Sequence, residues 1–420
     1  MNKSKEIGVY ADWGGLETPQ FTGTLYASHV RGKEIFSFEY SKNWLQSSFA
    51  QEIDPDLGLY SGIQYMRDEK SIFGVFLDSS PDRWGRLLMD RRESILARME
   101  NRPRRNLSES DYLLGVFDEQ RLGALRFKDT GSDVFMNENR NFVIPPWTSI
   151  RELEQASYQL ENELFEDDSE QLKWLYMLLA PGSSLGGARP KAGVRHTDGS
   201  LWIAKFPSKD DKYDVGAWEM IVNELAQMAG LNVTQAMAKQ FYGKHHTFLT
   251  KRFDRTVNKR RLHFASAMTL LGYMDGVSFQ DGASYPELAE FIIRKGVKVE
   301  QDLEELYRRI VFSVCVSNTD DHLRNHGFLL TPDGWTLSPA YDINPNPKGI
   351  GLKLNISAYD NSLNLDLVSE VASFFRLTNN QATSIIQNTV NVVSKWKQIA
   401  MKYKISKEEQ NKMSAAFRFA

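Results

Sequence analysis

The chain has 420 residues, of which 41% are hydrophobic and 25% are charged, and its formal net charge is −3 with a pI near 6.2. Such a chain can bury a large core divided among two or three structural units, and its charge excludes a globally basic, nucleic-acid-binding surface. The single cysteine, Cys315, excludes an intrachain disulfide and favours a reducing, cytoplasmic compartment.

The sequence gives no sign of export or of membrane insertion. The first ten residues are polar and charged, which predicts that no signal peptide is present. The strongest apolar runs, at residues 174–180 and 310–316, are too short to cross a bilayer. We therefore expect a cytoplasmic protein without a membrane partner.

The N-terminal region has the pattern of a small β-rich module. Strands separated by glycine and polar turns are predicted at residues 7–10, 21–26 and 34–40. Ser80, followed by Pro81 and Asp82, predicts the start of a helix that continues through Leu96. A hydroxyl can cap free amides, proline suits the first turn, and an acid suits the positive end of a helix.

The middle of the chain changes character several times. Residues 131–146 are polar, end in two prolines and predict a linker. Residues 150–179 are predicted to be mainly helical, with a break at the acidic residues 166–168. A glycine-rich segment at 180–191 follows, and an Asp-Gly turn within residues 192–206 predicts a hairpin.

The remainder of the chain is predicted to be mostly helical. A β-like segment is expected at residues 247–253 and a hairpin at residues 328–337. Apolar residues between 368 and 393 recur at helical spacing, and this pattern predicts core helices.

The glycine-rich segment is a candidate phosphate-binding loop. Glycine lets backbone amides approach phosphate oxygens, and Ser183 and Ser184 add hydroxyl donors. The segment matches neither G-x-x-x-x-G-K-[ST] nor a dinucleotide fingerprint that opens a helix. The alternative interpretation is an ordinary surface turn.

One lysine, Lys205, lies in an apolar strand next to this loop. A buried lysine is costly unless it is paired, so we expect a phosphate or a carboxylate beside it. Glu219 on the following predicted helix is a candidate partner, as in the lysine–glutamate pair with which kinases hold nucleotide phosphates. Alternatively, Lys205 points to water from an edge strand and Glu219 is a solvated helix residue.

The segment 317–325 contains a carboxylate and an amide, Asp320 and Asn325, directly after an apolar run. Phosphotransferases of the kinase type hold a base beside a magnesium ligand at this D-x-x-x-x-N spacing. The predicted hairpin would bring Asp342 back beside Asn325, and oxygen ligands suit a hard divalent cation. His322 is expected to support the loop through a structural hydrogen bond. The alternative is a polar loop whose acids and amides cap turns.

Five ordered segments carry a resemblance to a known family, at residues 182–191, 204–206, 251–255, 318–325 and 340–342. With them the chain resembles the HipA family, serine/threonine kinases that act as toxins of bacterial toxin–antitoxin systems. The resemblance implies an α+β, protein-kinase-like two-lobed fold with a β-rich N-terminal module (1–130), a nucleotide-binding lobe (131–255) and a mostly helical catalytic lobe (256–420). The motifs H-R-D and D-F-G of eukaryotic protein kinases are absent from the sequence.

The resemblance also implies residue roles. Asp320 would be the catalytic base, and Asn325 and Asp342 would hold Mg²⁺. The expected ATP-binding residues are Ser184, Gly186, Gly187, Lys191, Lys205, Glu219, Lys251, Arg252, Phe253 and His322. Among them, residues 251–253 would form the strand that links the lobes, and the backbone of this strand would contact adenine. Ser184, or the adjacent Ser183, would be autophosphorylated, and a phosphate there would keep the loop away from the site of the ATP phosphates.

From the resemblance we expect an ATP- and Mg²⁺-dependent protein kinase. Its expected partner is a HipB-like helix-turn-helix antitoxin, through which it would reach operator DNA. The expected substrate is an aminoacyl-tRNA synthetase or another translation protein. Two alternatives stay open, namely a small-molecule or lipid kinase and a catalytically silent corepressor or scaffold for a DNA-binding antitoxin.

Overall fold

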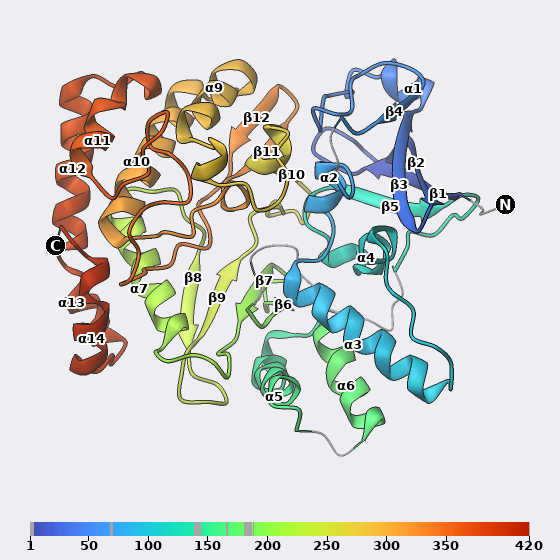
Figure 1. Cartoon of the computed structure of the whole chain (residues 1–420), viewed down its shortest axis with the longest axis horizontal. Coiled ribbons are helices and arrows are strands. Elements are labelled where there is room, and N and C mark those ends of the chain that lie inside the picture. The colour runs from blue at the N-terminus through green and yellow to red at the C-terminus, as the bar shows by residue number, and fades with distance from the viewer. Residues whose placement is uncertain are drawn as a thin grey trace. The chain divides into compact units, whose positions relative to one another are not determined.

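The structure is a computed structural model (Figure 1), and it describes residues 4–67, 70–137, 144–164, 167–179, 187 and 189–419. Helices and antiparallel strand pairs occur together in it, which confirms the α+β fold class. The chain forms two compact units, Met1–Asp210 with Asp254–Ala265 and Asp211–Phe253 with Ser266–Ala420. The division into residues 1–130, 131–255 and 256–420 stays a prediction.

The first unit contains a five-stranded sheet of order β4-β3-β2-β1-β5 (Figure 1). Its strands are β1 (Lys5–Ala11), β2 (Gln20–Val30), β3 (Lys33–Tyr40), β4 (Ile63–Tyr65) and β5 (Leu125–Asp129). Alternate residues such as Phe36 and Phe38 are buried, because successive side chains of a strand point to opposite faces. The three strands predicted near the N-terminus are confirmed.

The described part of the first unit also contains α-helices and short 3₁₀ helices. They are α1 (Lys42–Leu45), α2 (Gly74–Asp78), α3 (Arg83–Met99), α4 (Glu109–Gly115), η1 (Asp118–Gln120), η2 (Trp147–Ser149), α5 (Ile150–Glu161) and α6 (Asp168–Leu179). The predicted break between two helices is confirmed, but Asp168, which was assigned to it, already begins α6, and Glu166 lies outside the described residues. Helix α3 packs against α6 (Figure 1).

The predicted start of α3 is confirmed, but the role given to Ser80 is wrong. The N-cap is Asp82, whose side chain accepts a hydrogen bond from the amide of Gly85 at 2.9 Å. Ser80 instead lies just beyond the C-cap of the preceding helix α2, and its hydroxyl donates back to the carbonyl oxygen of Phe76 in that helix at 2.8 Å.

The first unit also contains the predicted hairpin, with strands β6 (Lys191–Arg195) and β7 (Leu201–Lys205) in antiparallel register. Gly193 lies opposite Ile203 in this pair, and a Cβ on Gly193 would meet the side chain of Gln120 at 2.4 Å. The close approach explains a glycine in the middle of a buried strand.

The second unit is mostly helical, as expected. Its elements are α7 (Val215–Met228), β8 (Ala236–Lys239), β9 (Thr247–Lys251), α8 (Ala267–Leu270), η3 (Phe279–Asp281), α9 (Tyr285–Lys295), α10 (Val299–Val316), η4 (Leu323–Asn325), β11 (Gly327–Thr331), β12 (Gly334–Leu337), α11 (Leu365–Glu370), η5 (Ala372–Phe375), α12 (Asn379–Val393), α13 (Trp396–Lys402), α14 (Lys407–Met413) and η6 (Ser414–Ala416). A further strand, β10 (His263–Ser266), lies where the chain passes from one unit to the other.

The predicted hairpin at 328–337 is confirmed, with Phe328 opposite Leu337. The predicted strand at 247–253 is confirmed only as far as Lys251, where β9 ends.

Helix α10 forms the centre of the second unit. Every residue from Ile310 to Val316 is buried, and the hydroxyl of Tyr307 donates to the carbonyl oxygen of Val368 at 3.1 Å. Val368 and Phe375 are buried as predicted, and α10 packs against α12 (Figure 1). Among the described residues, no helix has the length and apolar character needed to cross a bilayer.

Candidate active site

In the first unit, two of the predicted ATP-binding lysines lie opposite each other on the β6–β7 hairpin. Lys191 and Lys205 are paired in register, so their side chains leave the same face of the hairpin. The ammonium of Lys191 is buried, lies 2.7 Å from Oδ2 of Asp82, and donates to the carbonyl oxygen of Gly187 at 3.0 Å. Lys191 is thus part of an ion pair at the N-terminus of α3, and Lys205 is also buried.

Three predicted residues of the glycine-rich loop, Ser183, Ser184 and Gly186, lie outside the described residues. Gly187 is described and is exposed, with φ at +30°. A glycine that adopts a positive φ agrees with the conformational freedom expected of such a loop.

In the second unit, α10 ends at Val316, and its C-cap, Ser317, has a left-handed backbone with φ of +51°. The segment that follows, the 317–326 loop, folds back on itself. The carbonyl oxygen of Asp320 accepts hydrogen bonds from the backbone amide of His322 and from Nδ2 of Asn325, both at 2.9 Å. The carboxylate of Asp320 stays exposed, whereas Asn325 is buried. Residues 320–325, which carry the D-x-x-x-x-N spacing, therefore form a closed turn in which the carboxylate of Asp320 is exposed.

The segment after β12 lies against the 317–326 loop. The hydroxyl of Tyr341 donates to the carbonyl oxygen of Arg324 at 2.6 Å, and the amide of Asn344 donates to Oδ1 of Asn318 at 3.2 Å. Between these contacts lies Asp342, whose Oδ1 accepts from Nδ2 of Asn344 at 3.2 Å. The hairpin thus returns the segment of Asp342 to the 317–326 loop, and the predicted position of Asp342 beside Asn325 stays a prediction.

Asp342 has a left-handed backbone with φ of +57°. Residues other than glycine adopt this conformation at an energetic cost, and such residues concentrate at functional sites. Asp342 thus has an uncommon backbone conformation, one that aspartate tolerates better than most residues.

The predicted adenine-binding segment reaches the same place. The rings of Phe253 and Tyr341 lie 5.4 Å apart at 34°, and Phe253 is half-buried. Lys251 ends β9, and its amide donates to the carbonyl oxygen of Gln235 at 2.9 Å. Arg252, between them, is buried. Within the second unit, the structure thus brings together the segments of Phe253, Asp320 and Asp342.

Glu219 and His322 are the remaining predicted site residues. Glu219 is buried on α7, and its pairing with Lys205 stays a prediction. Within the described part of the chain, Nδ1 of His322 is buried without a hydrogen-bond partner. His322 supports the loop through its backbone amide, which donates to Asp320, and Nδ1 does not make the predicted side-chain bond.

The residue types predicted for the metal site suit a hard cation. Asp320 and Asp342 offer carboxylates, and the bond from Nδ2 of Asn325 to Asp320 fixes the orientation of the amide that carries Oδ1. Mg²⁺ typically takes one or two carboxylates in a protein and completes its shell with water and phosphate oxygens. Among the described residues, no group of three or more His, Cys, Asp or Glu could hold a metal ion. A set of two acids and one amide is compatible with that observation.

Asp321, next to Asp320, is a residue that sequence reasoning left without a role. Burial acts to raise the pKa of its carboxyl, but the neighbouring His326 and hydrogen bonds from Tyr285 and Ser313 bring this pKa below its ordinary value. Asn318 and Tyr341 were also missed. All three lie within the quoted motifs, so adjacency to the predicted acids was the available signal.

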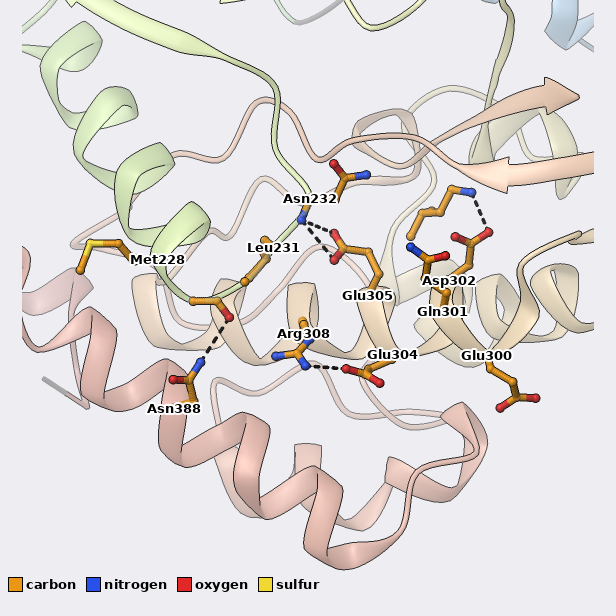
Figure 2. Close-up of a pocket in the computed structure, with 13 residues that line it drawn as sticks. Met228, Leu231, Asn232, Glu300, Gln301, Asp302, Glu304, Glu305, Arg308 and Asn388 are labelled. Atoms are coloured by element: carbon orange, nitrogen blue, oxygen red, sulfur yellow. Dashed lines mark hydrogen bonds and ion pairs between the residues drawn. The ribbon is translucent and has the colours of Figure 1, made fainter.

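A pocket of about 810 Å³ lies elsewhere in the second unit (Figure 2). Its acids already have partners within the protein, because Glu304 pairs with Arg308, Glu305 accepts from the amide of Asn232, and Asp302 accepts from the amide of Leu337. None of the predicted site residues lines this pocket. It is therefore separate from the candidate active site.

Comparison with known proteins identifies the family of the chain and relatives of its fold. Residues 183–396, about half of the chain, match the family model described as HipA-like C-terminal domain. A Haemophilus influenzae protein whose name assigns it provisionally to the kinases is 25% identical over 188 residues, 40% of this chain and 54% of that protein. The serine/threonine-protein kinase toxin HipA of Shewanella oneidensis is 23% identical over 190 residues, 39% of this chain and 43% of the toxin.

These alignments span about half the length of the curated relatives. In structure, the chain is similar to HipA in a complex of Shewanella oneidensis HipA, HipB and operator DNA, with a TM-score of 0.66 and 18% identity over 99% of this chain and 95% of that one. This likeness establishes the fold. By the match of its C-terminal half, the chain belongs to the family of proteins with a HipA-like C-terminal domain.

Proposed function

We propose that the protein is an ATP- and Mg²⁺-dependent serine/threonine kinase. The observation that carries the proposal is the convergence, within one unit, of three segments that are distant in the chain. Tyr341 contacts both the Phe253 ring and the carbonyl oxygen of Arg324, so the predicted adenine, base and metal segments meet at one residue. A scaffold has no physical need of this combination.

In the proposed reaction, Asp320 accepts the proton of a serine or threonine hydroxyl. The hydroxyl oxygen then bonds to the γ-phosphorus of ATP, the bond from that phosphorus to the bridging oxygen breaks, and ADP leaves. The exposed carboxylate of Asp320 suits a base that must reach a protein substrate. General-base catalysis of this kind contributes roughly a hundred- to ten-thousand-fold in rate.

Asn325 and Asp342 would hold the cation, and Mg²⁺ bound there would neutralise phosphate charge. Lys205 would contact the nucleotide phosphates, with Glu219 as its partner. Phe253 and the backbone at Lys251 would bind the adenine. Catalysis would then rest mainly on positioning and charge stabilisation.

We also propose the biological setting that the relatives suggest. The protein would be the toxin of a toxin–antitoxin pair in the bacterial cytoplasm, with a HipB-like antitoxin that brings it to operator DNA. Its substrate would be a translation protein such as an aminoacyl-tRNA synthetase. Phosphorylation of Ser184, or of Ser183, would switch it off, because a dianionic group there repels the ATP phosphates.

The test is transfer of labelled phosphate from ATP in the presence of Mg²⁺, with the chain itself and a bacterial lysate as acceptors. We expect the wild type to incorporate phosphate and Asp320→Asn to lose this activity. Asp333→Asn is the matched control, because it removes an exposed carboxylate at the β11–β12 turn of the same unit.

Equal labelling by Asp320→Asn and the wild type would contradict the proposed base. Normal ATP binding without any transfer would favour the scaffold, and transfer to lipids or sugars alone would favour a small-molecule kinase. Mass spectrometry of the labelled chain would identify the modified serine.

A further inference from the structure

A buried polar cluster anchors the 317–326 loop to the core of the second unit. It consists of Asp321, Tyr285, Ser313 and His326, and each of the four is at most 4% exposed. Oδ2 of Asp321 accepts from the hydroxyl of Tyr285 at 2.5 Å and from that of Ser313 at 3.2 Å. Nε2 of His326 lies 2.9 Å from Oδ1 of the same carboxylate. Oδ2 of Asp321 is therefore hydrogen-bonded, and Oδ1 is in close contact with the ring of His326.

Two members of the cluster are chain neighbours of predicted site residues. Asp321 follows Asp320, and His326 follows Asn325. The contact between Asp321 and His326 closes the same turn that the hydrogen bond from Asn325 to Asp320 closes. The turn thus contains one hydrogen bond and one close contact, and we expect a displacement of Asp321 to move the base and the metal ligand relative to each other.

The cluster also joins the loop to three helices. Tyr285 is the first residue of α9 and its amide donates to Asn355 at 3.0 Å, while Ser313 lies on α10. The carbonyl oxygen of His326 accepts from the amide of Ala267, at the start of α8, at 2.7 Å. Helices hold a side chain in place more closely than a loop can hold its own residues.

We propose that Asp321, oriented by Tyr285, is a positioning residue that sets the separation of Asp320 and Asn325. This inference rests on the proposed kinase function. The acid touches neither substrate nor nucleotide in this role, and acts through the backbone it shares with Asp320. A misplacement of about 1 Å at a reacting group can reduce the rate about a hundredfold.

The test is Tyr285→Phe, which removes the 2.5 Å donor and keeps the ring. The measured quantities are the rate constant of self-labelling at saturating MgATP, the ATP concentration that gives half the maximal rate, and the melting temperature. The matched control is Tyr307→Phe, because Tyr307 is equally buried in the same unit and its hydroxyl donates to a backbone carbonyl far from the loop in sequence. Ser313→Ala is a milder second variant should Tyr285→Phe fail to fold.

We expect Tyr285→Phe to lower the rate constant about ten- to a hundredfold with little change in the ATP concentration at half-maximal rate. Tyr307→Phe should lose similar thermal stability and keep the wild-type rate constant. A wild-type rate in both Tyr285→Phe and Ser313→Ala, or an equal loss in Tyr307→Phe, would overturn the positioning role and leave the kinase proposal intact. Absence of any transfer by the wild type would instead reject the kinase proposal.

Discussion

The buried ion pair between Lys191 and Asp82 predicts that the variant Lys191→Met is much less stable than the wild type. The side chains of Lys191 and Asp82 are 1% and 5% exposed, and their charged atoms lie 2.7 Å apart. Methionine retains most of the stem volume but leaves the Asp82 carboxylate buried without its cation. Removing one partner of a buried pair typically costs about 3–5 kcal/mol.

We expect Lys191→Met to lower the free energy of unfolding by about 3 kcal/mol, at the lower end of this range, because Asp82 keeps its hydrogen bond from Gly85 as the N-cap of α3. The loss should be confined to the first unit, so it is best followed by hydrogen-exchange mass spectrometry of α3 amides across a urea series. Asp82→Ser in the same chain is the control, since serine still caps the helix but carries no charge. The double variant should recover much of the lost stability.

The competing expectation is that Lys191 binds ATP. If the free energy of unfolding of Lys191→Met is within about 1 kcal/mol of the wild-type value and the variant still loses MgATP affinity, the structural role argued from burial is refuted. A large loss of stability that Asp82→Ser relieves would support it. The two outcomes separate a phosphate ligand from a core ion pair.

Three further predictions concern stability. Burial lowers the pKa of His263 from 6.5 to about 3, so only the unfolded chain takes up this proton below pH 6.5, and stability should fall by about 3 kcal/mol between pH 6.5 and 4. In urea titrations His263→Phe should lose less stability over that range, and an unchanged acid dependence would contradict the assignment. Gly216→Ala should destabilise α7 by about 2 kcal/mol or more, because its Cβ would lie 2.0 Å from the carbonyl oxygen of His246. The control is Gly14→Ala, whose Cβ would meet no atom within 4 Å and whose urea midpoint should equal that of the wild type. Thr378→Ala should cost about 1 kcal/mol by removing the capping box of α12, and an unaltered urea midpoint would show that the cap contributes nothing.

Local patterns in the sequence were sufficient for much of the fold. The alternation of apolar residues predicted β1 to β3, and the turn residues predicted the β6–β7 and β11–β12 hairpins. These features depend on neighbours a few residues apart, where backbone geometry fixes which side chains share a face. The closed turn from Asp320 to Asn325 is of the same kind, since its two hydrogen bonds span at most five residues.

Other features depended on partners that no local pattern names. Asp82 rather than Ser80 caps α3, and Asp82 is 109 residues from Lys191, with which it pairs. The resemblance to the HipA family placed Lys191 at the nucleotide. Lys191 is buried beside Asp82 because the β6–β7 hairpin packs against the N-terminus of α3.

The candidate site divides in the same way. The sequence by itself determined which acids and amides are available and how far apart they are in the chain, because spacing is written in the order of residues. Only the tertiary structure decided that Tyr285 meets Asp321 across 36 residues and that Phe253 meets Tyr341. Contacts between distant residues form only where packed helices and strands bring them together, and the free energy of that packing is spread over the whole core.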